Sequence, residues 1–340
     1  MKRFSILAVI LGTACIATAS PPTVEELWSH LFTNGPVVWQ APTNNLPKSF
    51  WTYKKILPQV FSSSVISNAI VLASLQKKGF PQPSTNQIII WEPSMENLSP
   101  NTDDPLAGSF SILPDQATIS YSMPHFDLDS GKDIPSDEAI VKRARNSAVQ
   151  LGLDPLKLMQ KPLTFHVCSF DENGHDNTNS QICGRRIYLS RQIDGFSFYG
   201  DGDNFSGGFW MEFGSHGKVR GFCLSWPTLQ RNVVSLTASP EQIVTCIKSH
   251  KTFVMPNGDE AGYFARLKTL ASAKKLTVTK ITPYYGEGTF GEVPTNDAAN
   301  IFVTPYAELE AVADFGNSNA TVRLVSPILS SEVTRLLGSK

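Results

Sequence analysis

The chain has 340 residues, of which 41% are hydrophobic and 17% charged, and its formal net charge is −1. This hydrophobic content argues for folded structure rather than disorder, and the length is enough for two or three domains. A near-neutral charge without a basic block gives no electrostatic case for binding nucleic acid or an anionic membrane surface.

The first residues have the pattern of a secretory signal. Lys2 and Arg3 give a positive start, residues 4–16 are almost wholly apolar, and Ala-Thr-Ala at 17–19 supplies the small side chains that a signal peptidase requires. We therefore predict that residues 1–19 are a signal peptide and that the protein is secreted or periplasmic.

Two alternatives exist for this segment. A membrane anchor would need roughly 20 apolar residues, and residues 4–19 are fewer. Cys15 suggests lipoprotein anchoring, although Leu11 lies one position too far before it for the usual lipobox. Since no second apolar stretch approaches membrane length, we expect no membrane span after signal cleavage.

Residues 20–132 are predicted to form an N-terminal α+β region. The stretch 60–80 is typical of a mostly buried helix that ends at Gly79, and short strands are expected within 88–92, 108–113 and 117–122. This order of a helix followed by strands raises the alternative that the region is a third, diverged copy of the unit described next.

Two helix starts with similar sequences follow. "SDEAIV" at 136–141 and "SPEQIV" at 239–244 align without gaps. Ser239 is a favoured N-cap residue, and Gln242 three positions later completes a capping box. The first of these helices is expected to extend from Asp137 to about residue 151, because Gly152 is the favoured residue after a helix end.

A pair of strands follows each helix. "LTFHV" at 163–167 corresponds to "LTVTK" at 276–280, and "IYLSRQI" at 187–193 to "IFVTPYAEL" at 301–309. The shared order predicts an α+β fold built from tandem units, each a helix packed on an antiparallel β-meander. The predicted units are residues 133–232 and 233–340.

The glycine-rich stretch 191–226 is interpreted as sheet and turns. Asp194-Gly195 is typical of a tight hairpin, and alternating apolar residues predict strands at 208–214 and 218–226. A phosphate cradle would need a glycine loop that opens a helix. Here the loop carries Asp201 and Asp203 and leads into a strand, so the glycines are predicted to form turns.

Four cysteines lie outside the predicted signal peptide. An even number of cysteines in a protein exported to an oxidising compartment suggests disulfide bonds. Cys168 and Cys183 flank a polar loop, which favours a bridge across a hairpin. Cys223 on a strand and Cys246 on a helix are left for a second bridge. Other pairings and four buried free thiols are the alternatives.

The hairpins "YLSRQIDGFSFYG" and "GGFWMEFGSHGKVRGF" resemble the core of PepSY-like domains and of the related fungalysin and thermolysin propeptides. The tandem arrangement resembles YycH/YycI-type extracytoplasmic regulators, over roughly residues 133–340. The resemblance implies a module that restrains or senses another protein. The matching residues are Arg191, Gln192, Gly195, Gly200, Glu212, Gly217 and Val219.

No residue pattern indicates catalysis or a cofactor. The sequence contains neither H-E-x-x-H nor G-x-S-x-G, and the acidic stretch 127–138 has Lys132 where a calcium loop needs glycine. We therefore expect no catalytic, cofactor-binding or metal-ligating residues. The predicted function is non-enzymatic binding of an extracytoplasmic protein or peptide along an open sheet edge. The alternatives are a hydrolase with an unrecognised carboxylate pair and a structural surface protein.

Overall fold

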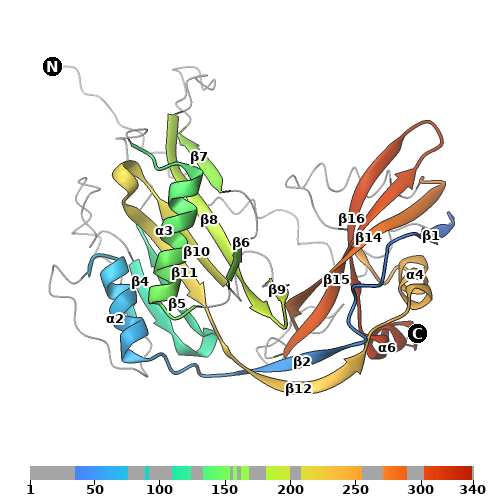
Figure 1. Ribbon diagram of the computed structural model, residues 1–340, viewed down its shortest axis with the longest axis horizontal. Coiled ribbons are helices and arrows are strands. Elements are labelled where there is room, and N and C mark those ends of the chain that lie inside the picture. Colours follow the sequence, from blue (N-terminus) through green and yellow to red (C-terminus); the bar gives the residue numbers. More distant parts are fainter. Residues whose placement is uncertain are drawn as a thin grey trace, which may run out of the picture.

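The strands of this computed structural model join into one 16-stranded sheet with a separate group of helices at each end (Figure 1). Within the part of the chain that the structure describes, neighbouring strands are antiparallel except in two pairs, β1–β14 and β9–β14. The structure describes residues 35–75, 89–91, 109–123, 133–153, 156–158, 162–167, 181–199, 208–254, 270, 272–288 and 302–338. The predicted signal peptide lies outside these residues.

The first end of the sheet is covered by two helices, α2 (Ser63–Leu72) and α3 (Asp137–Gln150). Its strands are β3 (Ile89–Trp91), β4 (Ser109–Leu113), β5 (Thr118–Ser122), β6 (Leu156–Leu158), β7 (Leu163–Val167), β8 (Gln181–Ile193), β10 (Gly208–Phe213) and β11 (Val219–Ser225). Short 3-10 turns at Pro114–Gln116 and Ser215–Gly217 join β4 to β5 and β10 to β11.

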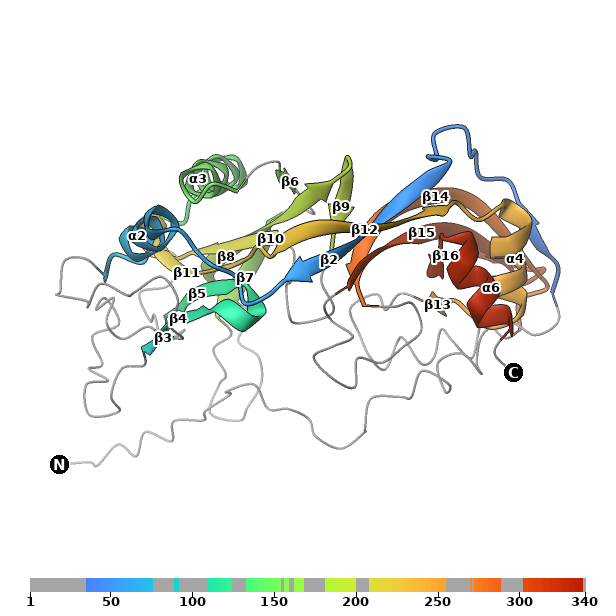
Figure 2. The ribbon, with the colours of Figure 1, turned by 90° about the horizontal axis from the view of Figure 1, so that it is seen from below.

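The second end is covered by α4 (Pro240–Lys248) and α6 (Ser330–Gly338). Its strands are β1 (Val37–Trp39), β13 (Phe253–Val254), β14 (Lys275–Glu287), β15 (Phe302–Asp314) and β16 (Asn319–Pro327). The two ends are connected by a part that we call the waist, where β2 (Ser49–Ile56), β9 (Phe196–Phe198) and β12 (Thr228–Leu236) lie (Figures 1 and 2).

Helix starts follow the predicted capping. The Ser136 hydroxyl accepts a hydrogen bond from the backbone N–H of Ala139 at the start of α3. At α4, Ser239 and Gln242 form the complete capping box. Such caps stabilise a helix by about 1 kcal/mol each, because they satisfy backbone N–H groups that have no partner in the first turn.

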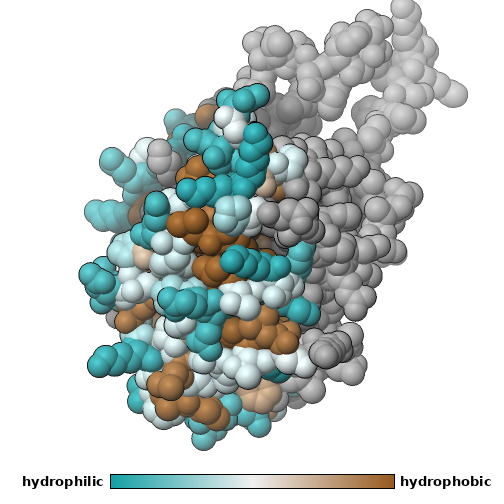
Figure 3. Space-filling model, turned by 90° about the vertical axis from the view of Figure 1, so that its right-hand side faces the viewer, coloured by the Kyte–Doolittle hydropathy of each residue, from teal (hydrophilic) through white to brown (hydrophobic). Residues whose placement is uncertain are grey.

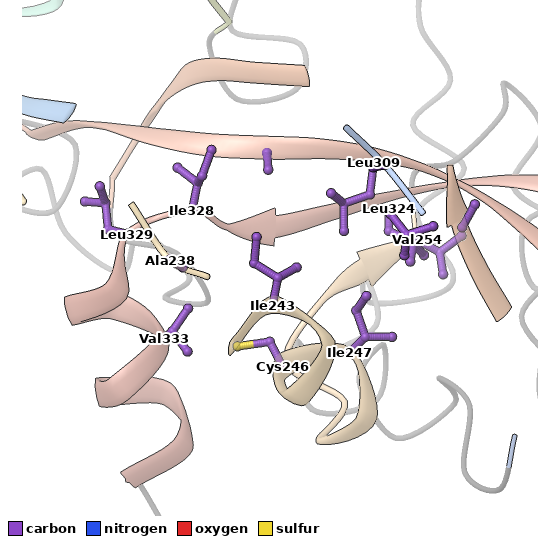
Figure 4. Packing of buried hydrophobic residues seen from close by; sticks show 14 of the residues in the cluster. Ala238, Ile243, Cys246, Ile247, Val254, Leu309, Leu324, Ile328, Leu329 and Val333 are labelled. Atoms are coloured by element: carbon purple, nitrogen blue, oxygen red, sulfur yellow. The ribbon is translucent and has the colours of Figure 1, made fainter. Parts of the chain in front are cut away.

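The two larger hydrophobic cores of the described residues lie under these helices. The core at the first end is built from α2, α3 and the alternating apolar residues of the strands, among them Phe209, Met211 and Phe213 on β10. At the second end, Ile243 and Ile247 project from α4 toward the strands that carry Leu309 and Leu324 (Figure 4). The predicted alternation of β10 and the predicted helices at 137 and 240 are confirmed.

The predicted fold class is wrong. The strands of the two proposed units belong to one continuous mixed sheet instead of two separate meanders, and the N-terminal strand β1 pairs in parallel with β14. The predicted order of helix and strands along the chain is observed. The pairing differs because alternation assigns a strand its faces but does not identify its partners. None of the described helices is long and apolar enough to cross a membrane.

Candidate functional site

The outermost strand on one side of the sheet, β12, is the candidate functional site. It pairs with β2, and no strand of the described residues pairs with its other side. Within the described residues, its first residue, Thr228, donates its backbone N–H to the Gln59 side chain, and its other end contacts the start of α6 through Ser235 and Ser331 and leads into an isolated bridge between Thr237 and Leu329. The outer N–H and C=O groups of an edge strand are a template for a further strand.

This edge exposes apolar side chains. The exposed fractions are 53% for Val233, 51% for Val234 and 70% for Leu236. Edge strands are commonly shielded by charges, proline or bulges, and exposed apolar residues on an edge favour pairing with another chain. β12 has two such shields, the exposed charge of Arg231 and a bulge between Arg231 and Val234. The remainder of the strand is suited to contact with a partner.

The register places Arg231 on the same face as the exposed apolar residues. Arg231 is opposite Tyr53 and Val234 is opposite Trp51, so both side chains lie on the face of β2 that carries these rings. The guanidinium carbon of Arg231 lies 5.2 Å from the centre of the Trp51 ring, a cation–π distance. A cation and an apolar residue therefore stand side by side along this edge.

A polar cluster holds β12 and β2 against the rest of the sheet. Asp194, in the turn between β8 and β9, accepts hydrogen bonds from the hydroxyls of Tyr53 at 2.5 Å and Tyr285 at 3.3 Å. Arg231 lies 3.7 Å from the other oxygen of the same carboxylate. We call these four residues the waist cluster. It connects β2, β12 and β14 to the predicted Asp194-Gly195 turn, which the structure confirms.

The turn itself explains why Asp194 reaches these partners. Both Asp194 and Gly195 have positive φ angles, 49° and 84°, as the two-residue turn of a hairpin requires. Ile193 pairs with Phe196 on either side of it. The tight turn leaves the Asp194 carboxylate at the end of the hairpin, within reach of three other strands.

A buried ion pair lies beside this cluster. Lys55 of β2 contacts Glu287 of β14, and their side chains are 9% and 7% exposed. The pair spans the start of β15, where only Phe302 and Val303 pair with β2. Glu287 contacts Lys55, and Asp194 accepts hydrogen bonds from Tyr53 and Tyr285. We therefore interpret these two carboxylates as structural contacts between strands.

Burial changes the proton affinities of the tyrosines and of a nearby arginine. Burial, followed by the hydrogen bond to Asp194, raises the pKa of Tyr53 to about 12. Burial also raises the pKa of Tyr285, and both hydroxyls therefore stay protonated donors at neutral pH. Arg191 has its pKa lowered to about 10 by burial, and it donates a hydrogen bond to the carbonyl of Pro227.

A second polar network lies on the first end of the sheet. Arg186 donates two hydrogen bonds to Glu212, at 2.6 and 3.0 Å, and its guanidinium carbon stacks 4.5 Å from the Trp210 ring centre. It also donates to the hydroxyl of Tyr188. Glu212, one of the residues that carry the family resemblance, is thus a buried partner of Arg186.

Two of the four cysteines predicted to form disulfides, Cys223 and Cys246, are described by the structure and are not bonded to each other. Cys223 on β11 and Cys246 on α4 carry free thiols, and Cys246 belongs to the core of the second end. The second predicted bridge is therefore not formed. Burial raises the pKa of Cys223 to about 12 and that of Cys246 to about 11. Cys168 and the side chain of Cys183 lie outside the described residues, so their pairing stays a prediction.

Sequence reasoning did not identify β12 or the waist cluster. The only local signal in "TLQRNVVSL" is its pair of β-branched valines before the Ser239 cap.

Among the described residues there is no group of three or more histidine, cysteine or carboxylate side chains able to hold a metal. On the face beside β1 and α4, apolar patches are separated by hydrophilic side chains (Figure 3).

Comparisons with known proteins do not identify a family. No family model matches the chain, and no curated protein matches it. Among solved structures, an uncharacterized protein from Eubacterium rectale ATCC 33656 is similar, with 12% sequence identity and a TM-score of 0.46 over 87% of this chain and 88% of the other.

Proposed function

We propose that the protein is an exported binding protein that accepts an extended segment of another protein along the outer edge of β12. The observation that carries this proposal is the exposure of Val233, Val234 and Leu236 on a strand whose outer side pairs with no described strand. The signal pattern of residues 1–19 supports export. The resemblance to PepSY-like modules supports a partner that is a protein.

Strand addition supplies affinity without catalytic groups. Each main-chain hydrogen bond to an added strand contributes about 0.5–1.5 kcal/mol net, and covering exposed valine and leucine side chains adds hydrophobic stabilisation. The waist cluster holds β2, the strand that pairs with β12, in place before binding, because the Tyr53 hydroxyl donates a hydrogen bond to Asp194 at 2.5 Å. A preformed edge reduces the ordering cost that binding incurs.

The test is selection of extended peptides from a random display library on the immobilised wild-type protein. Selected peptides are then measured against the double variant V234K/L236K, which places two charges on the edge. The control is V149K, because Val149 is an equally exposed valine, 69%, but lies on α3 away from the edge. We expect at least a tenfold loss of affinity in the edge variant and none in the control.

Two results would overturn the proposal. One is a library that yields no peptide above background. The other is a set of peptides that bind the edge variant, the control and the wild type equally, because such binding would occur elsewhere on the molecule. Circular dichroism of all three proteins checks that the edge variant keeps its fold.

A further inference from the structure

We infer that the segment bound by β12 carries a carboxylate beside Arg231, two residues from an apolar side chain beside Val234. This inference rests on the proposed function and specifies the chemistry of its partner.

The ribbon formed by β2 and β12 is positively charged. Residues 46–57 and 227–238 contain no aspartate or glutamate. Lys48 and Lys54 are exposed on the β2 side, while Lys55 is occupied by Glu287. In a chain with a net charge of only −1, this local excess of cations favours an acidic partner.

Arg231 retains donors for such a partner. Its side chain is 62% exposed, and its ionic contact with Asp194 is long at 3.7 Å. The Asp194 carboxylate is bonded more closely by Tyr53, at 2.5 Å. A guanidinium has five N–H donors in a planar fork, and it recognises carboxylates through two of them at once.

The register determines the spacing on the partner. Between Arg231 and Val234 the bulge inserts one extra residue, so these positions are opposite Tyr53 and Trp51, which are two residues apart on β2. A regular strand on the other side of β12 meets them with the same spacing. We take it to be antiparallel, as bulged pairs usually are. The expected pattern is then an apolar residue, any residue, and an acidic residue.

A second copy of this chain fits the edge less well. Two antiparallel β12 strands centred on Asn232 would place the two Arg231 side chains diagonally across the new pair, roughly 7–8 Å apart. Like charges across strands are destabilising, so the occupant is inferred to be a different chain that carries negative charge.

The experiment measures binding of the peptide Thr-Thr-Val-Thr-Glu-Thr-Thr-Thr to the wild-type protein, together with versions that have glutamine or lysine in place of glutamate. Fluorescence anisotropy gives each dissociation constant at low and high salt. We expect the glutamate peptide to bind about five- to tenfold more tightly than the lysine peptide at low salt. The difference should shrink at high salt, because exposed charges are screened.

Protein variants identify the cation. R231E is expected to reverse the preference between the glutamate and lysine peptides, and R231Q to remove most of it. K54E, on the other face of the ribbon, serves as the control and should keep the preference for glutamate. Because the comparison of peptides uses the wild-type protein, it stays decisive even if R231E is unstable.

The outcomes separate this inference from the proposed function. Equal binding of the three peptides, with loss of binding in V234K/L236K, overturns the acidic partner and leaves edge binding intact. A glutamate preference that R231Q leaves unchanged also overturns it. If selected peptides bind V234K/L236K as they bind the wild type, the proposed function itself fails.

Discussion

Breaking the buried ion pair between Lys55 and Glu287 is expected to destabilise the protein strongly. In K55M, the Glu287 carboxylate, which is 7% exposed in the wild type, loses its cation. Removing one partner of a buried pair typically costs about 3–5 kcal/mol, because the remaining charge has neither water nor a counter-ion. That loss is a large share of a typical stability of about 5–15 kcal/mol.

The free energy of unfolding of K55M is measured by urea denaturation and compared with K280M. Lys280 pairs with Glu310, but these side chains are 59% and 38% exposed, so K280M should cost less than about 1 kcal/mol. The double variant K55M/E287L should recover most of the loss, since apolar replacement of a buried pair is often neutral. A K55M cost no greater than that of K280M would refute the reasoning.

Further predictions concern the turn, the tyrosines, the thiols and a cap. Asparagine in D194N tolerates the positive φ of this turn but lacks the charge of aspartate. Thermal denaturation should therefore show a loss in the free energy of unfolding that is about 1 kcal/mol smaller for D194N than for D194A. The raised pKa of Tyr53 means that the folded state holds its proton longer than the unfolded state. Stability should therefore fall as pH rises from about 10 to 12, and more steeply in the wild type than in Y53F. The pKa of Cys223 is near 12, so at pH 8 this thiol should react with iodoacetamide far more slowly in the folded protein than in protein unfolded by urea. Equal rates in the two states would contradict its burial. S239A should lower the free energy of unfolding, measured by urea denaturation, by about 1 kcal/mol, because it removes the capping box of α4.

Local features of this chain were predictable because short-range chemistry determines them. The Asp194-Gly195 hairpin and the helix starts at residues 137 and 240 depend on residues only a few positions apart. The helix predicted at 60–80 is observed as Ser63–Leu72, and its predicted end at Gly79 lies outside the described residues.

The assembly of strands and the candidate site were not predictable in the same way. The β1–β14 and β2–β12 pairs join strands that are distant in the sequence, and hydrogen bonds of this kind leave no local pattern. Tyr53, Asp194 and Tyr285 come from three separate segments. Cys223 and Cys246 looked like partners only because both remained after the first pairing.

The parallel pairing of β1 with β14 has a consequence for biosynthesis. Val37 is among the first described residues of the chain, and its partner Leu276 emerges from the ribosome much later. At about 5–20 residues per second this delay is roughly 10–50 s. During that interval Phe50 and Trp51 have no finished core to enter, which exposes the nascent chain to aggregation and to chaperones. Folding of the second end should therefore begin only when synthesis is nearly complete.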